Sequence, residues 1–277
     1  MYGPALIVAL SLPFLAMMSV GFVLPLSESV INSFRSDPEA NRQFAEAYRE
    51  ILADELFRTV LIRTFTTAAV VSLISLVLAY PTAEFIASCS SRTRPFLLAL
   101  VVVPLWSSVI ARTYAWYGVF VRDGLVDRVA DLFGYGPQQL LFSRLAVTLG
   151  MVQVMLPIMI LPIYAAVIRY DERLSRASLS LGASRLRTLL LVKLPMLAPT
   201  IVAATAAVFI ITLGFFITPA ILGGPRTQLI SNLIWQQIYQ TFDLQRAQAM
   251  SVTLLGTTLL LLLFFGGLLL LTRRYLR

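Results

Sequence analysis

Six long apolar stretches limit what this chain can fold into. They are Ala5–Leu26, Thr59–Ile86, Phe96–Val119, Leu145–Ile168, Thr200–Leu222 and Ala247–Leu271. A bilayer core about 30 Å thick is crossed by a helix of roughly 20 apolar residues. The chain is 58% hydrophobic and only 13% charged, so it lacks the polar residues that would cover a water-soluble domain of its length. The sequence therefore predicts an all-α integral membrane protein, with residues 1–277 forming one domain of six transmembrane helices.

The first stretch has an alternative interpretation as a secretory signal peptide. No basic residue precedes it, and it is longer than the apolar region of a signal peptide. It ends in Pro25-Leu-Ser-Glu28, which differs from the small-residue pattern of a cleavage site. We therefore interpret it as a membrane span.

The basic residues indicate the orientation in the membrane. Three segments, 88–95, 169–194 and the tail after Leu271, contain Arg92, Arg94, Arg169, Arg173, Arg176, Arg185, Arg187, Lys193, Arg273, Arg274 and Arg277, against only Asp171 and Glu172. In the opposite loops the two charges nearly balance. Because cytoplasmic loops carry an excess of Lys and Arg, these segments and both termini are predicted to be cytoplasmic. The net charge of +8 thus reflects topology and gives no reason to expect nucleic-acid binding.

Several kinds of chemistry are excluded by the residues that the chain lacks. It has no histidine, which removes Ser-His and Cys-His catalysis and His-ligated metals. Its single cysteine, Cys89, forms no internal disulfide. No GxxxxGK[ST] motif is present to bind ATP. Asp123, Asp127 and Asp131 are spaced along one helical face, but neighbouring arginines neutralise them. We therefore expect no catalytic site, no metal site and no bound cofactor in this chain.

Residues 27–58 are predicted to form a long outer loop that contains an amphipathic helix. Asp37-Pro38-Glu39 is typical of a helix start, and Phe44, Tyr48, Leu52 and Leu56 recur about every four residues. This helix has two interpretations. It lies at the membrane interface as a lid on the bundle, or it forms part of a docking surface for a soluble partner.

Residues 169–199 break the apolar pattern with a defined arrangement of polar residues, glycine and proline. We expect a short helix capped by Ser175 and ended by Gly182, because glycine tolerates the positive φ of a helix stop. A second, amphipathic helix is expected over residues 184–193, ended by Pro195 and Pro199. The segment is then a rigid projection suited to transmitting force from a soluble partner. The alternative is a simple connecting loop.

The same segment resembles the EAA loop of ABC importer permeases. Gly182-Ala183, Leu194-Pro195 and Pro199-Thr-Ile201 match the pattern of that loop. The family's Glu-Ala-Ala is Arg176-Ala177-Ser178 here, and its glycine after the last proline is Thr200. The resemblance implies a coupling helix that docks on an ATP-binding subunit. The ATPase-coupling residues that it implies are Asp171, Glu172, Arg176, Ala177, Ser178, Gly182, Ala183 and Pro195.

The resemblance covers nearly the whole chain and is strongest to the spermidine/putrescine-type permeases. The segments that carry it are Ala79–Pro81, Val103–Trp106, Ala111–Trp116, Leu156–Tyr164 and Gly214–Pro225. It implies the type I ABC importer (MetI-like) permease fold in a bacterial inner membrane. The implied partners are a second, homologous permease chain, two cytoplasmic ATP-binding subunits that carry ATP and magnesium, and a periplasmic substrate-binding protein, besides membrane lipid.

The resemblance implies a polyamine as the solute, and aromatic side chains suit a cation through cation–π contacts. The expected pathway residues are Glu84, Trp106, Arg112, Tyr114, Trp116, Phe215 and Phe216. Glu84 has an alternative role in pairing with Arg92 or Arg94, and Arg112 in pairing with Asp123 or Asp127 or in reaching the headgroups. The positive charge of Arg112 also keeps open other solutes, such as phosphonates, opines or amino-acid derivatives. An ion-coupled secondary transporter and an intramembrane enzyme are the remaining rival classes.

Overall fold

The computed structural model describes residues 4–35, 46–136 and 139–275, with side chains for 11–35, 46–136 and 139–267. Over these residues every regular element is a helix, and the only β-type pairing is one bridge between Phe142 and Gly223. The chain divides into two compact units. Unit one comprises Met1–Thr59 and Leu233–Thr257, and unit two comprises Val60–Asn232 and Thr258–Arg277.

The predicted membrane spans are confirmed in number, with one qualification. Five helical segments of the described chain are long and apolar enough to cross a bilayer: Ser11–Phe34, Glu55–Ser88, Arg144–Val167, Arg185–Leu213 and Leu244–Gly267. A bent pair, Thr93–Trp106 with Val109–Leu132, makes a sixth if it is counted as one span. The all-α membrane fold therefore agrees with the sequence.

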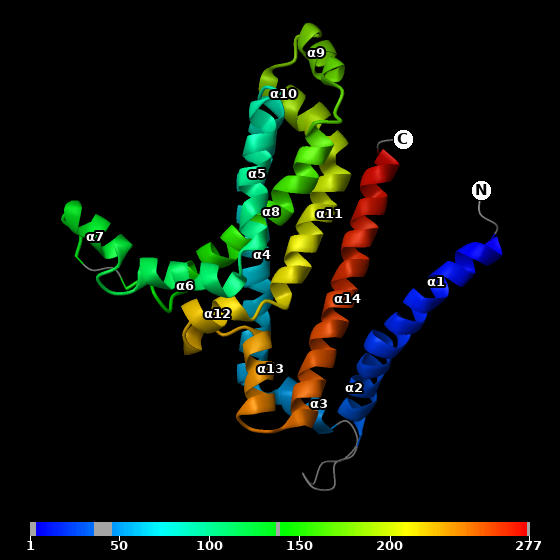
Figure 1. Cartoon of the computed structure of the whole chain (residues 1–277), viewed down its shortest axis with the longest axis vertical. Helices are drawn as coiled ribbons and strands as arrows, with labels where there is room; N and C mark the ends of the chain where they lie inside the picture. Colours follow the sequence, from blue (N-terminus) through cyan, green and yellow to red (C-terminus); the bar gives the residue numbers. More distant parts are fainter. Residues whose placement is uncertain (1–3, 36–45, 137–138, 276–277) are drawn as a thin grey trace. The chain divides into compact units, whose positions relative to one another are not determined.

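The core of unit two is built around α8 (Arg144–Val167), which is the most buried of the candidate membrane spans. Against it pack α4 (Glu55–Ser88), α5 (Thr93–Trp106) and α11 (Leu194–Leu213). Met151, Met155, Met159 and Ile163 lie at intervals of four along α8 and are completely or almost completely buried. Figure 1 shows α5, α8 and α11 side by side, with α6 and α12 crossing them at one end and α9 and α10 at the other.

The third predicted span, Phe96–Val119, is wrong as a single helix. It breaks after Trp106, and α6 (Val109–Phe120) continues at 96° to α5. Ser107 has extended backbone, Ser108 also departs from helical geometry with a ψ of 134°, and the amide of Ser107 donates to the carbonyl of Pro104, three residues back instead of four. α6 then packs on α12 (Ile217–Leu222) and leads to the short helix α7 (Leu125–Leu132).

The two prolines expected to end the second helix of the 169–199 segment do not end it. Pro195 lies in the first turn of α11 and Pro199 lies inside that helix. A π-helical turn, η2 (Leu189–Lys193), directly precedes them and joins α10 (Arg185–Thr188) to α11. Because α10, η2 and α11 form one continuous helical segment, Pro195 removes one amide donor within it, directly after the π turn. Proline and π turns both interrupt the regular helical hydrogen bonds and are common causes of bends.

The fifth predicted span, Thr200–Leu222, likewise differs from the observed helix. α11 starts at Leu194 and ends at Leu213, and residues 214–216 separate it from α12. Of the six predicted spans, the fourth agrees best with a single helix, within one residue at each end.

Unit one contains α1 (Pro4–Met18), the π turn η1 (Ser19–Val23), α2 (Leu24–Phe34) and α3 (Glu46–Ala53). The later chain adds most of α13 (Ile230–Tyr239) and the first part of α14 (Leu244–Tyr275). Arg246 of α14 forms an ion pair with Asp54, next to α3. The expected helix start at Asp37-Pro38-Glu39 and the side chain of Phe44 lie outside the described residues.

The predicted amphipathic helix of the outer loop has a different buried face. Ala47 and Ile51 of α3 are buried, whereas Leu52 and Leu56 are exposed. Tyr48 is held by a hydrogen bond of its hydroxyl to Ser33 Oγ at 2.7 Å and by stacking on Phe34 with ring centroids 4.5 Å apart. Long-range contacts of this kind decide which face of a short helix is covered, and spacing alone does not contain them.

Candidate functional site

The projection at 169–199 begins with α9 (Glu172–Ser180), which starts earlier than predicted. The side chain of Asp171 caps it by accepting a hydrogen bond from the amide of Arg173 at 2.9 Å. Ser175, the predicted cap, lies inside the helix, and its Oγ is 3.0 Å from the hydroxyl oxygen of Tyr170. The sequence Asp-Glu at a helix start is itself a capping signal, and it was the better one.

Gly182 ends α9 in the way the sequence predicts. Its φ is +86°, in the left-handed region that favours glycine. The amide of Gly182 donates to the carbonyl of Leu179 at 3.0 Å, and the amide of Ala183 donates to that of Ser178 at 3.2 Å. These two bonds form a Schellman motif, which satisfies the last carbonyls of the helix and reverses the chain.

The turn leads directly into α10, and side chains hold the two short helices together. Ser184 caps α10 by accepting a hydrogen bond from the amide of Arg187 at 3.3 Å. Ser178 Oγ of α9 and Thr188 Oγ1 of α10 are 3.0 Å apart, and Thr188 is buried. The projection is therefore a defined structural element, which argues against the simple connecting loop.

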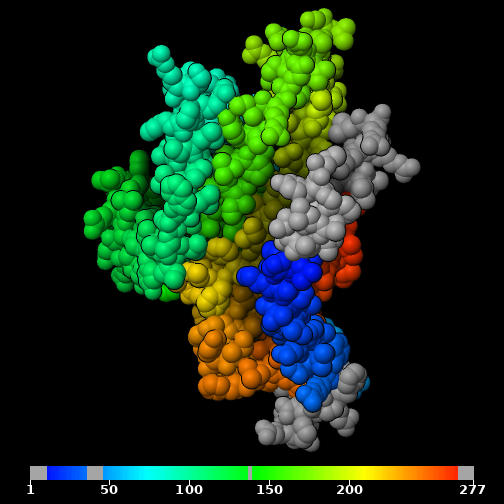
Figure 2. All heavy atoms as spheres, turned by 45° about the vertical axis from the view of Figure 1, so that its right-hand side comes forward, coloured from blue at the N-terminus to red at the C-terminus, as the bar shows by residue number. Residues whose placement is uncertain are grey.

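The exposed tip of the projection combines leucines with basic side chains. Leu181 is 89% exposed, and Leu179 and Leu186 are also exposed. The arginines exposed on α9 and α10 are Arg173, Arg176, Arg185 and Arg187. Figure 2 shows this part of the chain, in light green, standing clear at one end of unit two. Exposed apolar residues rimmed by charges are typical of a protein–protein contact surface.

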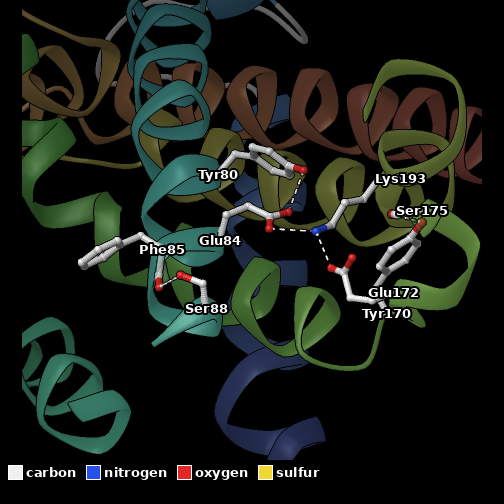
Figure 3. Close-up of polar contacts among 8 residues, drawn as sticks. All are labelled: Tyr80, Glu84, Phe85, Ser88, Tyr170, Glu172, Ser175 and Lys193. Carbon is white, nitrogen blue, oxygen red and sulfur yellow. Dashed lines mark hydrogen bonds and ion pairs between the residues drawn. The ribbon is translucent and has the colours of Figure 1, made fainter. Parts of the chain in front are cut away.

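At the base of the projection, Lys193 joins three elements (Figure 3). Its Nζ lies 2.8 Å from Glu84 Oε2 of α4 and 3.0 Å from Glu172 Oε1 of α9. The hydroxyl of Tyr80 donates to the other oxygen of Glu84 at 2.8 Å. Nζ also lies 5.2 Å from the ring centroid of Tyr170. Lys193 could not be recognised from the sequence as a partner of Glu84, because 109 residues separate them.

The alternative pairing of Glu84 with Arg92 or Arg94 is therefore not what the structure contains. Arg94 Nη2 instead donates to the carbonyls of Ala87 and Cys89, at 2.8 and 3.0 Å. These carbonyls lie at the end of α4, where a helix has unpaired acceptors and attracts positive charge. Arg94 thus caps the C-terminus of α4, and Glu84 forms its ion pair with Lys193.

The residues predicted for the solute pathway do not form one cluster. Arg112 and Trp116 of α6 line a small cavity of about 240 Å³ together with Gln153 of α8. Trp116 also stacks on Phe120, with centroids 5.0 Å apart. Trp106 is 86% exposed and Tyr114 is also exposed. Their role in transport stays a prediction.

Phe215 and Phe216 lie in the break between α11 and α12, and their backbone carbonyls accept hydrogen bonds from later side chains. The carbonyl of Phe215 accepts a hydrogen bond from Ser231 Oγ at 2.7 Å, and that of Phe216 accepts one from Asn232 Nδ2 at 3.2 Å. Ser231 thus supplies a partner for the carbonyl of Phe215 at the break, whereas the carbonyl of Phe216 also keeps a helical partner, the amide of Ala220 at 3.1 Å. Nearby, the Oγ1 atoms of Thr113 and Thr218 are 3.2 Å apart and join α6 to α12.

A larger cavity of about 830 Å³ was not anticipated from the sequence. Its lining includes Tyr117 and Phe120 of α6, Asp127 of α7, and Gln139 and Phe142 from the segment before α8. Asp127 is buried, and its Oδ2 accepts a hydrogen bond from the amide of Asp123 at 2.9 Å. The aspartate spacing noted above thus has a local structural cause, because Asp127 caps the turn that starts α7.

Comparison with known proteins places this geometry in context. The profile of the family described as "binding-protein-dependent transport system inner membrane component" matches residues 90–277. The spermidine/putrescine transport system permease protein PotB of Escherichia coli (strain K12) is 32% identical over 205 residues, which is 73% of this chain and 74% of the relative. The inner membrane ABC transporter permease protein YdcU of the same strain is 32% identical over 192 residues, covering 64% and 61% of the two chains.

Solved structures support the same fold. A chain of a bacterial alginate ABC transporter in complex with an alginate pentasaccharide-bound periplasmic protein superposes with a TM-score of 0.76. The match covers 95% of this chain and 93% of that one, at 18% identity. A second structure of a bacterial ABC transporter that imports alginate gives a TM-score of 0.74 over 97% and 95% of the chains, at 19% identity.

Proposed function

We propose, from the premise that this chain belongs to the family of binding-protein-dependent transport system inner membrane components, that it couples ATP hydrolysis on a partner subunit to solute import through residues 169–199. The chain is a multi-pass inner membrane protein and an ABC importer permease. We infer that it works with a second permease chain, two ATP-binding subunits and a periplasmic binding protein.

The observation that carries this proposal is the projection formed by α9, the Gly182 turn and α10. It presents exposed leucines and arginines, and it continues through η2 into the span α11. A soluble subunit that binds the tip would therefore move a segment whose backbone continues directly into the membrane helix α11. The Arg176-Ala177-Ser178 triplet places a basic residue where the family has an acidic one, so the partner surface facing it is expected to be acidic.

For the solute, we propose a polyamine of the putrescine or spermidine type. The relatives named for spermidine/putrescine transport support this class. The larger cavity is lined by the aromatic side chains of Tyr117 and Phe120 and by the carboxylate of Asp127, and also by Arg122, whose charge opposes a cation. A diamine binds favourably to aromatic and carboxylate groups through cation–π and ionic contacts.

The test is reconstitution of this chain in liposomes with its second permease, ATPase and binding protein. ATP hydrolysis and uptake of labelled putrescine and spermidine would be followed together. We expect polyamine-stimulated hydrolysis with matching uptake. Stimulation by another solute alone would retain the importer and remove the polyamine. Uptake driven by an ion gradient without ATP would refute the proposal as a whole.

A second solute class is favoured by one observation, the environment of Arg112. Within the described structure its buried Nε and Nη1 atoms have no hydrogen-bond partner. An unpaired guanidinium in a membrane protein is costly and favours an anionic partner. A carboxylate- or phosphonate-bearing solute would supply one. Adding such solutes to the same assay decides between the two classes.

A further inference from the structure

We propose that Lys193 is a positioning residue that carries the movement of α9 and α10 to a second span, α4, through its ion pair with Glu84. This inference rests on the proposed function, because it concerns how coupling proceeds once an ATPase subunit acts on the projection. It assigns to Glu84 a role in coupling in place of the role in the solute pathway that the sequence suggests.

The three charges come from three separate elements. Glu84 lies near the end of α4, Glu172 is the first residue of α9, and Lys193 is the last residue of η2. Figure 3 shows the Lys193 ammonium between the two carboxylates. A single side chain therefore connects the start of the projection, its junction with α11 and the neighbouring span.

The two ion pairs differ in strength. The side chains of Lys193 and Glu84 are only 12% and 28% exposed, whereas that of Glu172 is 60% exposed. Exposed ion pairs contribute little because water and salt screen them, and partly buried pairs are screened less. The ion pair of Lys193 with Glu84 is thus the stronger of the two, and water readily replaces the contact with Glu172.

The oxygens of Glu84 are already engaged within the protein. Oε1 accepts from the hydroxyl of Tyr80 and Oε2 from Lys193, both at 2.8 Å. A carboxylate held by two donors on different elements fixes geometry. It is poorly placed to receive a passing cation, which would have to compete with the ammonium of Lys193.

The π turn explains why such a connection is needed. Helices bend readily at π turns, and these turns are frequent at functional positions. η2 is the only backbone link from α10 to α11, so a push on the projection would be absorbed if this turn bent freely. Lys193 ends the turn, and its pair with Glu84 ties that end to α4. Movement of the projection then reaches α11 through the chain and α4 through the ion pair.

The experiment uses the complete reconstituted complex and measures solute taken up per ATP hydrolysed. The variants are Lys193→Met, Glu84→Gln and the charge exchange Glu84→Lys with Lys193→Glu. The solute is putrescine, or whichever solute stimulates the wild type in the assay above. We expect each single variant to lower the ratio by about three- to tenfold, and the exchange to restore most of it, as for directly coupled residues.

Matched variants make the result specific. Glu172→Gln removes the exposed pair and should change the ratio by less than about twofold. Arg92→Met removes an exposed basic residue of the segment that follows α4 and should leave the ratio of uptake to ATP hydrolysis unchanged. Should Lys193→Met fail to assemble, the charge exchange and Glu84→Gln, which preserves shape, still test the pair.

Two results would overturn the inference. One is an unchanged uptake ratio in intact complexes of Lys193→Met or Glu84→Gln. The other is a Glu84→Gln variant that raises the half-saturating solute concentration at a constant ratio, because this assigns Glu84 to the solute pathway. A wild-type complex in which no solute stimulates ATP hydrolysis would refute the proposed function itself, and this outcome is distinct from both.

Discussion

Gly182 and Gly134 allow backbone strain to be separated from coupling. Both have positive φ, +86° and +76°, and a Cβ on either would meet no atom within 4 Å. A residue with a Cβ costs about 1–2 kcal/mol in this conformation at either position. We predict that Gly182→Val lowers ATP-driven uptake severalfold, that Gly182→Asn retains more activity, and that Gly134→Val leaves uptake near the wild-type rate. Equal losses at both glycines would mean that the effect is one of stability alone.

Gly150 is required for a different reason, the close approach of α8 and α12. A Cβ on it would lie 2.8 Å from Leu222 Cδ1 and from Thr218 Cγ2. We predict that Gly150→Ala destabilises the protein by about 1–3 kcal/mol, as overpacking does. Gly118→Ala is the control, since its Cβ meets nothing within 4 Å and alanine favours a helix by roughly 0.5–1 kcal/mol. Thermal unfolding of the purified variants measures both, and a Gly150→Ala melting temperature at or above the wild-type value would contradict the predicted clash.

At the scale of elements, the register between α10 and α11 depends on the π turn η2. A π turn already accommodates one residue more than an α-helical turn, so a further residue inserted after Leu191 would rotate α9 and α10 by about 100° relative to α11. We predict that inserting one alanine after Leu191 abolishes coupled uptake while the spans remain folded. Leu191→Ala is the matched control, because it changes the same exposed position and keeps the register. Normal uptake by the insertion variant would show that the orientation of the projection does not matter.

Elements set by local signals could be predicted from the sequence, and those set by distant contacts could not. The fourth span was placed to within one residue because it is a long apolar run. The positive φ of Gly182 likewise follows from a local property of glycine. The bend between α5 and α6 was missed, and α6 is held by partners such as Thr218, 105 residues beyond Thr113.

The candidate site divides in the same way. The sequence identified the projection and its glycine, yet it named the wrong cap, Ser175 in place of Asp171. Glu84 was expected in the solute pathway or, alternatively, in a pair with Arg92 or Arg94, and the structure pairs it with Lys193. An ion pair across 109 residues has no signature in a single sequence, because it exists only once the helices have packed.

At the scale of the whole molecule, the distribution of Lys and Arg predicts that the projection faces the cytoplasm and that α7 faces outward. Two residues suit a direct test, because Leu181 is 89% exposed and Leu132 is 83% exposed. Replacing Cys89, the only cysteine, by serine gives a background for single cysteines at these positions. A membrane-impermeant maleimide should label Leu132→Cys in right-side-out vesicles and Leu181→Cys only in inverted ones.

Because both positions are similarly exposed, a difference in labelling reports the side of the membrane and not burial. The reverse pattern would place the basic loops outside, where no ATPase subunit could reach the projection, and labelling of both from one side would refute the predicted number of crossings between them.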